Sequence, residues 1–138
     1  MELTTNTEPL LIIRLGSKWR NEQEEIETGY LRSGKGWEPT ISDLDLADSV
    51  RAWWKFSPEK LDDRGIEHVV AYAAGRTRAL YRIVNVLGPR PRDGRHALQV
   101  ERIEEGELFD KVIGDDGMTV PFRLGSANPV KYWPPKGR

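Results

Sequence analysis

The stretch Ala71–Ile83 reads AYAAGRTRALYRI and predicts two β-strands joined by a tight turn at Gly75. Arg78 and Arg82 fall on one face of the second strand, because successive side chains of an extended chain point to opposite sides. Arginine supplies charge for phosphate and an aromatic ring supplies a flat face for a base, so the pattern suits a nucleic-acid-binding surface. The same pattern is also typical of a solvated sheet face, on which arginine stems cover Leu80.

Hydrophobic periodicity places most predicted strands in the second half of the chain. After Gly65 we expect strands at His68–Ala74, Arg76–Val86, Arg95–Ile103 and Glu107–Ile113, with Thr119–Leu124 as a candidate fifth. An apolar run at 10–15 predicts a buried first strand, and residues 17–40 are expected to form a long loop with a short helix around Asn21–Ile26.

Two helices are predicted between that loop and the strand region. The first is capped by Thr40 or Ser42 and extends to about Phe56, and the second begins at Ser57 with Pro58 in its first turn. Helices followed by a strand meander predict an α+β fold, in which a small twisted β-barrel-like sheet, mixed or antiparallel, carries two or three short helices.

Composition limits the classes of function. With 138 residues, 31% charged and 38% hydrophobic, the chain is expected to be one globular domain over 1–138, with loose tails at 1–8 and 134–138. A net charge of −1 argues against general coating of DNA, so any contact with nucleic acid would be local. The chain has no cysteine and two histidines, so we expect no disulfide, no metal site and no cofactor. The apolar run at 10–13 is too short for a signal or membrane segment, which favours a cytoplasmic protein without membrane contact.

Trp53 and Trp54 stand side by side at the predicted end of the first helix. Adjacent helical residues point about 100° apart, so the two rings cannot enter one core equally. One hypothesis is that one ring is core and the other covers the junction with the next element. The alternative is that one ring lines a pocket for a planar ligand.

Enzyme motifs are not found. Residues 29–35 match the start of a phosphate-binding loop, but Gly36 stands where serine or threonine is required, and Pro39 follows where a helix should begin. A nuclease-type E-x-K pair and a G-x-S-x-G elbow are also missing from the sequence. The sequence therefore favours binding over catalysis.

Four stretches together resemble a bacterial and archaeal family of small, mostly uncharacterised proteins. They are SVRAWWKFS at 49–57, VVAYAAGRTRALYRIVN at 69–85, the strand start at 94–95 and FRLGSANPVKYW at 122–133. This pattern is similar to the PUA-like superfamily, which includes ASCH, EVE and YTH domains. The chain departs from it at Ala52, at 73–74 and at 109–111, and it lacks the compact signature of the ASCH enzymes.

The resemblance implies a PUA-like pseudo-barrel that binds RNA or modified DNA, with an extruded base held in an aromatic pocket. It identifies as candidate site residues Trp53, Trp54, Arg78, Tyr81, Asn128 and Tyr132, to which the strand pattern adds Arg82. The Asn128–Pro129 pair either forms a turn that fixes the last strand or reads a base edge through the amide. We therefore expect a non-catalytic nucleic-acid-binding module that recognises a modified or flipped base. The alternatives are a hydrolase acting on a nucleoside or nucleotide, and a protein-interaction accessory of a defence system.

Overall fold

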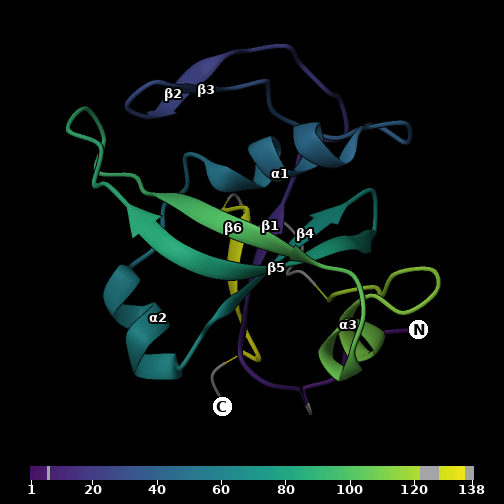
Figure 1. Cartoon of the computed structure of the whole chain (residues 1–138). Coiled ribbons are helices and arrows are strands. Elements are labelled where there is room, and N and C mark those ends of the chain that lie inside the picture. The colour runs from purple at the N-terminus through teal and green to yellow at the C-terminus, as the bar shows by residue number, and fades with distance from the viewer. Residues whose placement is uncertain (6, 122–127, 136–138) are drawn as a thin grey trace.

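The computed structural model describes residues 1–5, 7–121 and 128–135, and its centre is a mixed five-stranded β-sheet (Figure 1). The strand order is β6–β5–β4–β1–β7, where the strands are β1 (Leu10–Arg14), β4 (His68–Ala73), β5 (Arg76–Leu87), β6 (Ala97–Ile103) and β7 (Val130–Trp133). β1 pairs parallel with β4 and antiparallel with β7, and the remaining pairs are antiparallel. The α+β class is thus confirmed, while the described strands form an open sheet and no closed barrel.

The predicted hairpin around Gly75 is the β4–β5 pair. Val69 lies opposite Tyr81 and Val70 opposite Leu80, as alternation of buried positions requires. The register shifts between Ala71–Ala79 and Tyr72–Thr77, so one extra residue, Arg78, bulges from β5.

Helices cover both faces of the sheet. On one face α1 (Asp43–Arg51) and α2 (Pro58–Arg64) pack over a core that includes Val50, Leu61 and Tyr81. On the other face α3 (Glu107–Val112) packs over a core that includes Val112 and Trp133. Within the described part of the chain, no helix is both long enough and apolar enough to cross a membrane.

The predicted caps of the first two helices are confirmed. Ser42 Oγ accepts a hydrogen bond of 3.1 Å from the Asp45 amide, and Ser57 Oγ accepts one of 3.3 Å from the Lys60 amide. The predicted extension of the first helix to Phe56 is wrong, because α1 ends at Arg51. Trp54 instead pairs with His96 through backbone hydrogen bonds of 2.8 and 2.9 Å, which requires an extended chain.

Two further predictions of secondary structure are wrong. The predicted strand Glu107–Ile113 is the helix α3, in which Glu107 and Lys111 form an ion pair of 3.4 Å one helical turn apart. The predicted loop at 17–40 with a helix at 21–26 contains the hairpin β2 (Glu24–Glu27) and β3 (Tyr30–Arg32) instead. Of the candidate strand 119–124, Thr119 bridges Glu2, and residues 122–124 lie outside the described residues.

The ends of the chain are only partly described. Leu3, within the expected N-terminal tail, is 3% exposed, and its amide donates to the Thr119 carbonyl over 2.8 Å. Of the expected tail at 134–138, residues 136–138 lie outside the described residues.

The β2–β3 hairpin lies on the outer side of α1 (Figure 1), and Glu27 of β2 also accepts from Gln99 of β6 over 3.3 Å. The buried carboxylate of Asp48 on α1 anchors this layer, accepting from Tyr30 Oη over 2.6 Å and from the Ser33 amide over 2.8 Å. Arg51 also contacts Glu27 of β2. Because these contacts join the hairpin to α1, the chain that leaves the hairpin at 33–36 runs along the helix.

Candidate functional site

A pocket of about 380 Å³ lies beyond the carboxyl end of β1. Its lining includes four cationic side chains, one aromatic ring and a proline, namely Arg14, Lys18, Arg20, Lys35, Trp54 and Pro129. Among the residues that the structure describes, the lining contains no aspartate and no glutamate. We refer to it as the Trp54 pocket.

The wall that carries Arg20 and Lys35 is built from two close backbone segments. The Arg20 amide donates to the Lys35 carbonyl over 2.8 Å, and the Lys35 amide donates to the Arg20 carbonyl over 3.0 Å. Glycine is required beside this bridge: a Cβ on Gly34 would lie 2.1 Å from the Arg20 carbonyl oxygen, and one on Gly36 would lie 1.9 Å from that of Lys18. The two glycines therefore allow segments 18–20 and 34–36 to run side by side.

Helix α1 fixes this wall from beneath. Ser49 is fully buried, and its hydroxyl both accepts from the Gly36 amide and donates to the Gly36 carbonyl, each over 2.8 Å. One side chain thus satisfies both backbone groups of Gly36. The position of Lys35 relative to α1 follows from this pair of bonds.

Trp54 occupies a second wall of the pocket and is only partly buried. Its indole Nε1 donates to the Val50 carbonyl over 2.6 Å, and its backbone is held by the pairing with His96. The His96 ring packs at a tilt of 43° against Phe56, with 5.4 Å between the ring centroids, and burial lowers the pKa of His96. The indole plane is therefore held at both its backbone and its ring nitrogen.

Asn128 directly precedes a residue of the pocket lining. Pro129 lines the pocket, and its carbonyl accepts from the Arg14 amide over 2.9 Å. The Asn128 Oδ1 accepts from the Val130 amide over 3.1 Å, which is the turn geometry expected for an Asn–Pro pair before a strand. Of the sequence-predicted site residues, Trp54 lines this pocket, and Asn128 precedes the lining residue Pro129 without lining the pocket itself.

Trp53 and Tyr132 lie elsewhere. Trp53 packs in a small cluster under the β2–β3 hairpin, with the Arg90 guanidinium 4.7 Å above its ring. Tyr132 accepts a hydrogen bond of 2.9 Å from the Ser57 amide, and Lys60 lies 5.4 Å from its ring. The two adjacent tryptophans therefore lie in different places: Trp54 lines the pocket, and Trp53 packs under the β2–β3 hairpin.

The three candidates on β5 also occupy separate surroundings. Tyr81 is 1% exposed, and burial raises its pKa to about 12. Arg82 forms an exposed ion pair of 2.6 Å with Glu101. The Arg78 guanidinium lies 4.4 Å from the Trp37 ring and donates to the Ala73 carbonyl over 2.8 Å.

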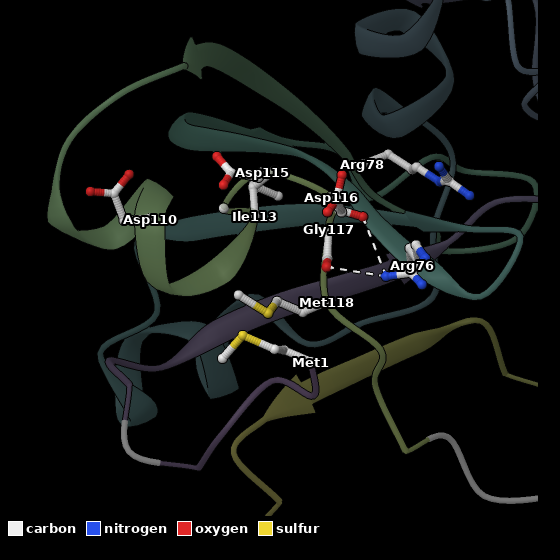
Figure 2. Close-up of a pocket in the computed structure, with 10 residues that line it drawn as sticks. Met1, Arg76, Arg78, Asp110, Ile113, Asp115, Asp116, Gly117 and Met118 are labelled. Carbon is white, nitrogen blue, oxygen red and sulfur yellow. Dashed lines mark hydrogen bonds between the residues drawn. The ribbon is translucent and has the colours of Figure 1, made fainter.

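A larger hollow of about 870 Å³ opens beside the start of β5 (Figure 2). Arg76 and Arg78 line it, but so do Asp110, Asp115 and Asp116. Figure 2 shows Arg76 turned toward the backbone of residues 116–117, where its Nη1 donates over 3.4 and 3.5 Å. The arginines of the predicted hairpin therefore share their surface with carboxylates, which makes this hollow less suited to an anion than the Trp54 pocket.

The cations of the Trp54 pocket were missed in the sequence. These cations are scattered over three separate stretches: Arg14 ends the first strand, and Lys18, Arg20 and Lys35 lie on the irregular segments 18–20 and 34–36. Only the Gly34–Gly36 spacing hinted at a close backbone approach. Among the described residues, no group of three or more His, Asp or Glu side chains is placed to hold a metal ion.

Comparisons with protein-family models, with curated proteins and with solved structures gave no significant match to this chain.

Proposed function

We propose that this chain binds nucleic acid and holds one nucleotide in the Trp54 pocket. The observation that carries the proposal is the lining itself, in which four cationic side chains surround an accessible indole and no carboxylate is present. In a chain with a net charge of −1, this is a local concentration of positive charge.

Each part of the pocket has a counterpart in a nucleotide. The Trp54 ring offers a face on which a base can stack, an interaction of about 1–3 kcal/mol per base. Arg14, Lys18, Arg20 and Lys35 would bind the phosphates on either side of that base. A volume of about 380 Å³ accommodates a single flipped or single-stranded nucleotide rather than a duplex.

Recognition of a modified base belongs to the same proposal. A base stacked on Trp54 would lie near the turn formed by Asn128 and Pro129, where amide groups can read its edge. A PUA-like affiliation is supported by the sequence resemblance and by a mixed sheet with three helices, while the described strands form no closed barrel.

A non-catalytic role is favoured over the hydrolase alternative by the chemistry of the lining. General acid–base catalysis of hydrolysis most often uses a histidine or a carboxylate within hydrogen-bond reach of the substrate. The described residues of the lining include neither, and the imidazole of His96, whose backbone pairs with Trp54, packs at a tilt against the Phe56 ring. Binding without turnover is therefore the expected activity.

The test is binding of a labelled single-stranded hexanucleotide, followed by fluorescence anisotropy over a series of salt concentrations. Lys18 is exposed and forms no ion pair within the described residues, so Lys18→Gln should leave folding unchanged. We expect this variant to bind more weakly and to show a salt slope shallower by about 0.7, the value for one phosphate contact on a single strand. Trp54→Leu should weaken binding by more than about fivefold through lost stacking.

The matched control is Lys111→Gln, which removes the same charge from α3 on the other face of the sheet. Its affinity and salt slope should equal those of the wild type. The proposal is overturned if the wild type does not bind at low salt, or if both lysine variants weaken binding equally. Probes carrying modified bases then show whether the pocket distinguishes them.

A further inference from the structure

Two cations of the Trp54 pocket already contact a carboxylate that lies outside its lining. Glu22 Oε1 is 3.3 Å from Lys35 Nζ, and Glu22 Oε2 is 3.8 Å from Arg20 Nη1. All three side chains are at least half exposed. Within the described residues, the carboxylate of Glu22 has no other ion pair or hydrogen bond.

The backbone directs Glu22 toward these cations. The Glu22 amide donates to the Arg20 carbonyl over 2.9 Å, so the chain turns back directly after Arg20. Arg20 and Lys35 are themselves held by their mutual backbone bridge, and Gly36 is held by Ser49. None of these backbone contacts depends on the Glu22 side chain.

We infer that Arg20 and Lys35 form a phosphate subsite, and that Glu22 occupies the place of the phosphate in the free protein. This inference rests on the proposed function. A carboxylate with one oxygen on each cation imitates two oxygens of a phosphate bound by the same pair. Glu22 is therefore a competitor that the incoming phosphate displaces.

The exposure of the three side chains makes this displacement easy. Exposed ion pairs contribute little, so removing Glu22 should raise the affinity for a phosphate by about 2–5-fold. A carboxylate that merely supported the pocket would have the opposite effect, because its loss would weaken binding. The sign of the change distinguishes the two roles.

The experiment measures binding of the same single-stranded hexanucleotide to the wild type, Glu22→Gln and Glu25→Gln. Glu25 lies three residues after Glu22, is exposed on β2 and pairs with neither pocket cation among the described residues, so its variant controls for net charge. Glu22→Gln is then repeated in a Lys35→Gln background. We expect a gain of about 2–5-fold for Glu22→Gln, a smaller change for Glu25→Gln, and a reduced gain when Lys35 is absent.

The outcomes separate this inference from the proposed function. If the wild type binds but Glu22→Gln gives no gain, or gives the same gain without Lys35, the subsite assignment is wrong and nucleotide binding stands. If the wild type does not bind at low salt, both fail. Probes with and without a 5′-phosphate assign the subsite further: a larger gain with the 5′-phosphate indicates a terminal phosphate, and equal gains indicate an internal one.

Discussion

Ser49→Ala should destabilise the protein, because one buried hydroxyl holds the pocket wall to α1. The substitution removes the two 2.8 Å hydrogen bonds between Ser49 and Gly36. Gly36 is buried, so its amide and carbonyl would lose the hydroxyl partner in a site away from water. The change itself is small in volume, so lost hydrogen bonding dominates its effect.

The expected magnitude follows from those two bonds. Each bond contributes about 1 kcal/mol net, and leaving its Gly36 group buried and unsatisfied raises that cost to about 1–2 kcal/mol, so losing both bonds should lower the free energy of unfolding by roughly 2–4 kcal/mol. The Lys18 carbonyl lies against Gly36, which leaves little room for a water to replace the hydroxyl. With a urea m-value of about 2 kcal/mol/M, the midpoint of unfolding should fall by roughly 1–2 M.

Urea unfolding followed by circular dichroism measures this change, and amide hydrogen exchange at Gly36 locates it. Ser17→Ala is the matched control, because Ser17 is exposed on the neighbouring segment, and its effect should stay within about 0.5 kcal/mol. If Ser49→Ala also stays within that limit and the Gly36 amide remains protected, Ser49 does not anchor the wall. The account of how Lys35 is positioned would then have to be abandoned.

Two further predictions concern titratable groups near α1. Burial raises the pKa of Tyr81 to about 12, above its ordinary value of 10, so the wild type should lose stability as pH rises through this range. Tyr81→Phe should remove that loss of stability at high pH. At neutral pH it should leave the free energy of unfolding unchanged or up to about 1 kcal/mol higher, because the hydroxyl has no hydrogen-bond partner among the described residues. A clear destabilisation at neutral pH would contradict this. The hydrogen bond to Asp48 is the main cause that raises the pKa of Tyr30. Asp48→Asn should therefore lower that pKa toward its ordinary value and speed amide exchange in the β2–β3 hairpin. An unchanged titration of the Tyr30 phenol would refute this contact.

The fold was most predictable where burial alternates along one segment. The β4–β5 pair and the caps at Ser42 and Ser57 depend on neighbouring residues, and the sequence pattern identified them correctly. The end of α1 did not follow from local pattern, because Trp54 is held extended by His96, which lies far away in sequence. A helical continuation and an extended bridge are both compatible with the local residues, and only the distant partner decides between them.

The segment that became α3 shows a different cause of error. Its apolar residues fit a short buried strand, and periodicity alone does not separate such a strand from a helix. The spacing of Glu107 and Lys111 favours the helix, as does their order along the chain. The spacing of these two charges was therefore the feature of the sequence that could have predicted a helix here.

The site was only partly predictable, because Trp54 and Asn128 carry recognisable chemistry while the pocket cations do not. Arg20 and Lys35 face one pocket through a backbone bridge between two irregular segments. A pairing of this kind has no period in the sequence. The glycines at 34 and 36 match the start of a phosphate-binding loop for an unrelated reason, namely the close passage of residues 18–20.

The arginines that cluster in the sequence are not the cations that line the Trp54 pocket in the folded protein. The loop after β5 looks basic, yet its Arg90 pairs with Glu24 of β2 and with Asp93, each over 2.6 Å. Folding therefore brings hairpin carboxylates onto the arginines that the sequence made prominent. The cations of the Trp54 pocket come from separate stretches, and the described residues that line the pocket beside them include no carboxylate. Glu22, whose carboxylate contacts two of these cations, lies outside the lining. A net charge near zero is thus compatible with a strong local site for an anion, because the opposite charges are consumed in pairs elsewhere.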